Sequence, residues 1–343
     1  MTIRICMVGA GRAGMVHART IKHSVHHATA VAVVDPVVES ARHMAEFLGG
    51  VRVFERLEDA LEAIPFDAVV ITTPTFTHCS LTVAAANAGK HVFCEKPMAL
   101  TVSECDDMIA VAARNHVALQ IGFMRRFQPE FVAAKQRIDD GEIGEPMIVK
   151  SLTRGPGLPP LWARSLELSN GMLAEVNSHD FDTVRWLMGS EITRIYTEAV
   201  NFKRAIHGID DPNFYDSAVV SLRFANNGLG TIDGTCPADY GYDARVEILG
   251  TRGVMVIGQM QSEALLISNN RDVGVISPIF RTWPERFRRG YIAEMTHFVD
   301  ALHSGELPTV SGLDGRRAVE AVIAANQSWQ EQRPVQLSEY NAG

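Results

Sequence analysis

Two groups of residues, far apart in the sequence, have the types and spacing that proton transfer requires. Glu95-Lys96-Pro97 follows a short apolar run, and a lysine at a strand end can hydrogen-bond a hydroxyl group and assist its deprotonation. Glu175 and His179 stand at positions i and i+4, so they share one face if residues 172–188 form a helix. The histidine could then accept a proton while the carboxylate orients it or holds a hydroxyl.

Both groups also allow a structural interpretation. Lys96 alone could be a solvated side chain at a strand end, and His179 could be a core-facing histidine tied to a carboxylate for stability. The chemical interpretation therefore depends on the other motifs of the chain.

A glycine motif supplies the first of these. Gly9-Ala10-Gly11-Arg12-Ala13-Gly14 closes an apolar run, residues 3–8, and opens a helical pattern. In a GxGxxG turn the first glycine allows the tight turn, the second lets a pyrophosphate approach the backbone, and the third lets the helix pack closely on the strand. The free N–H groups of the helix N-terminus then face the phosphates.

Asp35 ends the next predicted strand, residues 30–34, about 20 residues after the motif. Its carboxylate is placed to accept both hydroxyls of an adenosine ribose, and it would repel a 2′-phosphate. The sequence therefore favours NAD over NADP. The alternative is a glycine-rich turn in which Asp35 merely starts a turn before Pro36.

Composition narrows the class of protein. A chain of 343 residues predicts about two domains, and 46% hydrophobic residues can give each a core. The net charge is -8 without a long basic cluster, which argues against nucleic acid as a partner. We see no signal peptide and no apolar run of membrane-spanning length, so we expect a cytoplasmic protein.

Neither cysteine nor histidine predicts a metal site. The five cysteines have no CxxC spacing, and we interpret them as reduced, mostly buried thiols. His23, His26 and His27 lie close together, but no cysteine or carboxylate complements them at ligand spacing.

The elements that must position these residues follow two patterns. Up to residue 123, short apolar runs (3–8, 30–34, 51–54, 68–72, 91–94 and 117–122) alternate with helical periods. This pattern predicts a doubly wound Rossmann domain, whose ligands collect at the carboxyl ends of the strands, where Gly9, Asp35, Thr73 and Glu95 fall.

Residues 124–343 predict a second α/β domain with a large, open, mostly antiparallel sheet. Strands are expected at 147–153, 192–202, 217–224, 228–234, 244–249, 253–257 and 264–268, with a hairpin at 225–227. Helices at 172–188, 286–303 and 313–332 would cover one face of this sheet. A second copy of the chain, in a homodimer or homotetramer, would cover the other.

These motifs together resemble the glucose–fructose oxidoreductase / inositol dehydrogenase / MocA (Gfo/Idh/MocA) family over nearly the whole chain. The Glu-Lys-Pro element combined with a downstream His-Asp-x-Asp is more specific than the glycine motif. The resemblance implies an NAD-dependent enzyme that oxidises or reduces a secondary alcohol on a sugar or cyclitol. It makes Lys96 the substrate-contacting lysine and His179 the catalytic acid/base.

Site residues follow from the motifs and from this resemblance. Catalytic roles fall to Lys96, His179 and Glu175. Cofactor binding falls to Gly9, Gly11, Arg12, Ala13, Gly14, Asp35, Thr73, Thr75, His78, Glu95 and Lys96. The resemblance places Arg125, Tyr240 and Tyr242 near substrate hydroxyls, and Trp162 could stack on the apolar face of a sugar. Alternatively, Arg125 could pair with a surface carboxylate, the tyrosines could cap the sheet, and Trp162 could be core.

Two positions depart from the family pattern. Glu175 stands where inositol dehydrogenases have an aspartate, and its longer side chain would reshape the pocket. Thr73-Pro74-Thr75 replaces the Thr-Pro-Asn of many members, which removes an amide contact. The expected function is therefore NAD-dependent dehydrogenation of a polyhydroxylated ring. The alternatives are a redox-neutral sugar-modifying enzyme that keeps NAD bound and passes through a transient ketone, and a non-catalytic nucleotide-sensing regulator.

Overall fold

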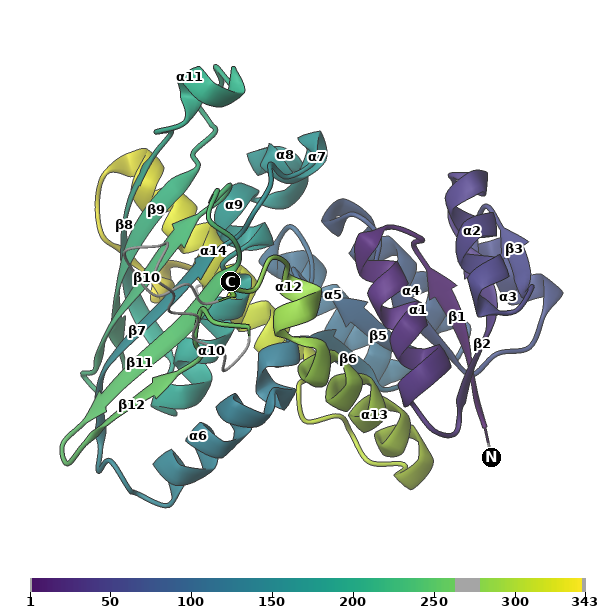
Figure 1. Ribbon diagram of the computed structural model, residues 1–343. Helices are drawn as coiled ribbons and strands as arrows, with labels where there is room; N and C mark the ends of the chain where they lie inside the picture. The colour runs from purple at the N-terminus through teal and green to yellow at the C-terminus, as the bar shows by residue number, and fades with distance from the viewer. Residues whose placement is uncertain (1, 263–277, 341–343) are drawn as a thin grey trace, which may run out of the picture. The chain divides into compact units, whose positions relative to one another are not determined.

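The computed structural model describes residues 2–262 and 278–340, which form two compact units (Figure 1). The first unit comprises Met1–Gln128, Glu167–Ser169 and Arg289–Glu320, and the second comprises Pro129–Leu166, Asn170–Arg288 and Ala321–Gly343. The sequence interpretation assigned all of residues 124–343 to a second domain. In the structure, residues 289–320 instead belong to the first unit.

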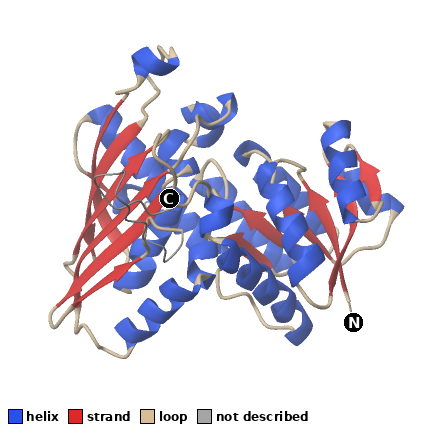
Figure 2. Cartoon of the chain, in the orientation of Figure 1, coloured by secondary structure: helices blue, strands red, loops and turns tan. Residues whose placement is uncertain are grey.

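The first unit contains a parallel sheet in the order β3-β2-β1-β4-β5-β6. Its strands are β1 (Ile3–Val8), β2 (Ala28–Val34), β3 (Arg52–Phe54), β4 (Ala68–Ile71), β5 (His91–Glu95) and β6 (Leu119–Gly122). This is the strand order of a doubly wound dinucleotide-binding fold, so the Rossmann prediction is confirmed. Figure 2 shows these strands in red with helices around them.

The helices of the first unit include one from late in the chain. They are α1 (Arg12–Ser24), α2 (Val38–Leu48), α3 (Leu57–Ala63), α4 (His78–Asn87), α5 (Val102–Arg114) and α13 (Arg288–Ser304), with short 3-10 helices η1 (Thr75–Thr77) and η2 (Met124–Phe127). Met295, Phe298 and Val299 of α13 are buried in the same core as Met7 and Phe93. Because its apolar residues are buried here, the expectation that residues 286–303 cover the second sheet is wrong.

The second unit contains a seven-stranded sheet in the order β12-β11-β7-β10-β9-β8-β13. Its strands are β7 (Pro146–Arg154), β8 (Ile192–Val200), β9 (Ser217–Phe224), β10 (Leu229–Thr235), β11 (Asp243–Gly250), β12 (Val254–Ile257) and β13 (Val335–Gln336). All neighbouring pairs are antiparallel except β7 with β10. The mostly antiparallel sheet and the hairpin at 225–227 are confirmed, whereas the strand expected at 264–268 lies outside the described residues.

Helices of the second unit are α6 (Pro129–Asp139), α7 (Leu161–Arg164), α9 (Gly171–Glu175), α10 (Ser178–Met188), α11 (Arg204–His207) and α12 (Trp283–Arg286); α8 (Leu166–Ser169) and α14 (Gly312–Glu331) have residues in both units. Helix α10 packs on β7 and β10, and Ser328 of α14 accepts a hydrogen bond from Thr197 of β8. Along β9, buried Val220 and Leu222 alternate with exposed Val219 and Ser221. One face of the sheet is thus buried under helices while the other carries exposed side chains.

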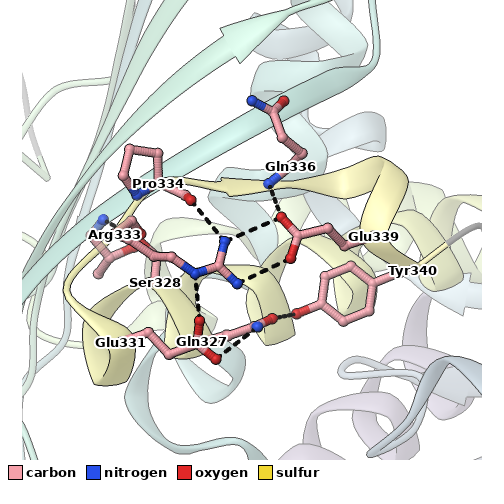
Figure 3. Close-up of polar contacts among 9 residues, drawn as sticks. Gln327, Ser328, Glu331, Arg333, Pro334, Gln336, Glu339 and Tyr340 are labelled. Carbon is pink, nitrogen blue, oxygen red and sulfur yellow. Dashed lines mark hydrogen bonds and ion pairs between the residues drawn. The ribbon is translucent and has the colours of Figure 1, made fainter.

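Strand β13 pairs with β8 at the edge of this sheet, and a network around Arg333 joins the residues before and after β13 (Figure 3). The Arg333 guanidinium binds Glu331 at 2.6 Å and Glu339 at 3.1 Å, and Glu339 accepts the backbone N–H of Gln336 at 3.0 Å. The hydrogen bond from Gln327 and then the pairing with Arg333 lower the pKa of Glu331, and the pairing with Arg333 lowers the pKa of Glu339. The network fixes the turn into the short 3-10 helix η3 (Leu337–Tyr340).

All five cysteines are free thiols, and only Cys79 is not fully buried. Burial raises the pKa of Cys6 to about 12, which makes that thiol a poor nucleophile. Within residues 2–262 and 278–340, no helix is both long and apolar enough to span a bilayer. The same part of the chain has no cluster of three or more His, Cys, Asp or Glu side chains placed to hold a metal ion.

Candidate active site

The glycine turn between β1 and α1 has the geometry that its spacing predicts. Gly9 has φ +100°, and a Cβ there would lie 2.8 Å from the backbone carbonyl of Thr72. A Cβ on Gly14 would lie 2.2 Å from the carbonyl oxygen of Gly9. Gly11 differs, because nothing lies within 4 Å of its Cβ position. The turn therefore has open space at Gly11, and no side chain caps the N-terminus of α1.

Asp35 lies beside this turn. Its Oδ2 accepts the Ala10 N–H at 2.7 Å and its Oδ1 accepts the Val37 N–H at 2.8 Å. A carboxylate has about four acceptor positions, so both oxygens can still accept ribose hydroxyls. Arg12 is exposed and Ala13 half-buried in the first turn of α1. The open turn, the uncapped helix and the half-buried carboxylate fit a bound dinucleotide.

The segment after β4 contains Thr73 and Thr75, the two threonines of the predicted cofactor site. Thr75 is buried, and the Thr77 hydroxyl donates to the Thr73 hydroxyl at 2.6 Å. Both ring nitrogens of His78 lie near backbone carbonyls, Nε2 at 2.9 Å from Thr73 and Nδ1 at 2.8 Å from Pro97. Burial lowers the pKa of His78, so the neutral ring donates to one carbonyl at a time. The geometry supports a role for His78 in joining these two loops, and direct cofactor contact stays a prediction.

Glu95 and Lys96 lie at the carboxyl end of β5. The Glu95 carboxylate is 6% exposed. Its Oε1 lies 2.7 Å from Nε2 of His17, and its Oε2 accepts the Lys96 backbone N–H at 3.0 Å. Lys96 is half-buried. Sequence reasoning missed His17, since a histidine inside a helix carries no signal of a partner so distant in the chain.

In the second unit, the helix expected at 172–188 is interrupted. Helix α9 ends at Glu175, and α10 starts at Ser178 after a turn at Val176 and Asn177. The expectation that Glu175 and His179 share one face of a continuous helix is therefore wrong. His179 is instead the second residue of α10 and is 5% exposed, while Glu175 is half-buried.

The first turn of α10 is anchored by buried polar contacts. Oδ1 of Asp180 accepts the Ser151 hydroxyl of β7 at 2.5 Å, and Oδ2 accepts the Asn177 amide at 2.8 Å. Asn177 fits because β10 has a glycine opposite it: a Cβ on Gly234 would lie 2.2 Å from the Asn177 Oδ1. These contacts fix the residues on both sides of His179.

Two predicted substrate residues lie in the loop before β11 and differ in exposure. The Tyr240 side chain is 39% exposed, and its hydroxyl donates to Asp243 at 3.0 Å. Tyr242 is 6% exposed, and its ring meets that of Phe287 edge-on at 6.1 Å. Tyr240 can therefore meet a solute from solvent, while the buried Tyr242 has the packing of a core side chain.

Arg125 and Trp162, the other predicted substrate residues, occupy different units. Arg125 is in η2 of the first unit and is 1% exposed. Trp162 is half-buried in α7 of the second unit.

Tyr240 lines an open cavity of about 530 Å³ in the second unit, together with Arg154, Lys203, Thr235, Ala238 and Asp239. Arg154 pairs with Asp233, whose hydrogen bond raises the arginine pKa. Lys203 pairs with Asp239 at 2.6 Å. Sequence reasoning missed Arg154 and Lys203, although a charged residue at a strand end before Gly155-Pro156-Gly157 was a usable signal.

The sequence and structure match known proteins along the chain. Residues 3–123 match the family model described as the oxidoreductase family with NAD-binding Rossmann fold, and residues 131–256 match that of the GFO/IDH/MocA C-terminal domain. The chain is 35% identical to myo-inositol 2-dehydrogenase of Thermotoga maritima, with 98% of this chain and 99% of the relative covered. It is 34% identical to scyllo-inositol 2-dehydrogenase (NAD(+)) of Bacillus subtilis, with 98% and 96% covered.

A solved structure gives the same result. The crystal structure of scyllo-inositol dehydrogenase from Lactobacillus casei with bound NAD(H) and scyllo-inositol superposes with a TM-score of 0.90 at 28% identity, covering 98% of this chain and all of that one (100%). The family resemblance expected from the motifs is confirmed. The chain belongs to the Gfo/Idh/MocA family, and it is an NAD-dependent oxidoreductase with the Rossmann fold of that family.

Proposed function

We propose that this protein is a cyclitol dehydrogenase that oxidises a secondary alcohol of an inositol with NAD. One observation carries the proposal: Gly9, Thr73 and Lys96 follow the neighbouring strands β1, β4 and β5 at the carboxyl edge of one sheet. This edge is where doubly wound folds bind ligands, so a lysine lies on the side of the sheet that binds the dinucleotide. Relatives of almost equal length that are named as inositol 2-dehydrogenases support the choice of substrate.

Each candidate residue has a distinct task in this proposal. The Lys96 amine donates a hydrogen bond to the reacting hydroxyl and stabilises the negative charge that develops on its oxygen. The His179 imidazole accepts the hydroxyl proton. Bound NAD supplies the acceptor for the carbinol hydride. Glu175, from the end of α9, holds a substrate hydroxyl or orients the imidazole.

Two substitutions test these roles. Lys96→Ala and His179→Ala should each lower kcat by ~10²-fold or more, since general acid–base groups contribute on that order. NAD affinity of the His179→Ala protein should match the parent. The matched controls Lys135→Ala and His26→Ala replace residues outside the site and should keep the parental kcat. Parental kcat in either test variant would remove that residue from the mechanism.

We also propose that the outer face of the second sheet packs against a second copy of the chain, in a homodimer or homotetramer. Exposed apolar residues lie on its strands: Val200, Val219, Leu229, Leu249, Val254 and Val256. Covering them removes apolar area from water at about 25 cal/mol per Å². Val219→Glu combined with Val256→Glu should reduce the molar mass measured by light scattering after size exclusion. An unchanged mass, or a monomeric parent, would contradict this interface. The cytoplasmic location stays a prediction.

A further inference from the structure

The Glu95 carboxylate, which the proposed mechanism does not use, is confined within the first unit. One oxygen binds the His17 ring at 2.7 Å and the other accepts the Lys96 N–H at 3.0 Å. On a third side lies Gly122, which pairs with Glu95 across β5 and β6. A Cβ on Gly122 would come within 3.0 Å of the Glu95 Cδ and Oε2 atoms. The carboxylate therefore fills a space in which it has little freedom to turn.

The His17 side chain is also buried and closely packed. It is 0% exposed, and its ring meets Phe93 of β5 edge-on at 5.0 Å and Tyr291 of α13 edge-on at 5.4 Å. His17 lies on α1, one helical turn after Gly14 of the glycine motif. The His17–Glu95 contact thus joins the dinucleotide-binding helix to the residue that immediately precedes Lys96.

The charges around Glu95 favour an ionised carboxylate. Burial would raise its pKa, but the hydrogen bond and charge of His17, together with the charge of Lys96, outweigh burial and lower it. Glu294 of α13 is also buried, and burial and then the negative charge of Glu95 raise its pKa well above the ordinary range. His78 and Cys94 also lie within electrostatic reach of Glu95. The surroundings therefore favour the ionised form of Glu95 and the neutral form of Glu294.

We propose that Glu95, fixed by His17, is a positioning residue that sets the backbone of Lys96 at the carboxyl end of β5. A carboxylate can accept from both the imidazole and the Lys96 N–H, whereas an amide has one acceptor oxygen and one donor nitrogen. Since an ionised carboxylate can only accept, the imidazole donates from Nε2, and a glutamine in place of Glu95 could accept from only one of these two donors. The inference rests on the proposed role of Lys96 in catalysis.

Hydrogen exchange at the Lys96 backbone amide tests this proposal directly. In the cofactor-free protein, hydrogen exchange at this amide should be about tenfold or more faster in Glu95→Gln and His17→Ala than in the parent. The first variant removes the charge that strengthens the bond to this amide, and the second removes the ring that fixes the carboxylate. His17→Gln retains a donor and should recover part of the protection. The same variants should lower kcat by about tenfold and change KM by less than about threefold, because substrate binding loses no direct contact.

Two controls separate positioning from general destabilisation. Glu294→Gln replaces a buried carboxyl whose raised pKa favours its neutral form with a neutral amide, and it should leave Lys96 exchange and kcat unchanged. Gly49→Ala places a side chain at φ +106° in open space at the end of α2, so it costs stability through the backbone alone. It too should leave both readouts at the parental values.

The outcomes distinguish this inference from the proposed function. Parental exchange and kcat in Glu95→Gln, together with an inactive Lys96→Ala, would overturn the positioning role and leave the function standing. A fully active Lys96→Ala would instead refute the function itself. Should Glu95→Gln fail to fold, Gly122→Ala, which pushes on the carboxylate without removing it, must show the same faster exchange for the inference to hold.

Discussion

Replacing Gly234 with alanine should destabilise the protein through a single contact. The new methyl group would lie 2.2 Å from the Asn177 Oδ1 and 2.8 Å from its Cγ, and Asn177 is completely buried. For Asn177 to move away, its 2.8 Å hydrogen bond to Asp180 must break. A hydrogen bond to a charged group is worth about 1.5–3 kcal/mol, and overpacking costs about 1–3 kcal/mol. Since Asn177 either moves and loses this bond or stays and is overpacked, we expect a loss of about 1.5–3 kcal/mol.

A double-mutant cycle isolates this contact. Asn177→Ala alone should destabilise by losing the hydrogen bond, but it also removes the atoms that the new methyl group would meet. Gly234→Ala in that background should therefore add less than about 1 kcal/mol, so the two changes are strongly non-additive. Thermal or denaturant unfolding of the four proteins measures this. Additive losses, or a Gly234→Ala protein within about 0.5 kcal/mol of the parent, would refute the close contact.

Three further results are expected. Asp35→Ala should narrow the preference for NAD over NADP, because the 2′-phosphate no longer faces a carboxylate; equal kcat/KM with both cofactors in the parent would contradict this role. Glu175→Gln should shift the acidic limb of the kcat/KM pH profile and Glu175→Asp should change the ranking of substrates, and parental behaviour of both would make Glu175 structural. Glu294 has a raised pKa in the folded state. Its stabilising contribution is therefore complete below the unfolded pKa of about 4.3 and is lost as the pH rises toward the folded value. Glu294→Gln should flatten the fall of Tm above about pH 5, and identical Tm profiles would show that this carboxyl is not held neutral.

Local patterns predicted the first sheet well because most of its strands are short apolar runs that are buried. Only β3 has no buried residue. The glycine motif was equally informative, since Gly9 and Gly14 meet backbone atoms that only glycine can approach so closely. The same reasoning failed at Val176 and Asn177. Apolar residues keep a helical period across the break, while in the structure the buried amide of Asn177 lies there against Gly234 of β10.

Contacts between distant segments account for the other differences. The apolar face of α13 matched either sheet equally well in sequence, whereas in the structure it packs in the core of the first unit, with Phe298 against Phe93. The His17–Glu95 pair could not be predicted for the same reason. The pair forms only when the end of β5 lies beside α1 in the fold, and no residue spacing within either segment predicts that.

The most direct test of the proposed function is the stoichiometry of NADH release. Purified protein would be mixed with excess NAD and with limiting myo-inositol or scyllo-inositol, with a ketone scavenger to pull the reaction forward, and the absorbance of NADH followed to its end point. We predict one NADH released per cyclitol consumed, and release that is slower by ~10²-fold or more in the His179→Ala protein. Consumption of a cyclitol without net NADH would indicate a redox-neutral enzyme, and the absence of turnover with every cyclitol offered would contradict the proposed function.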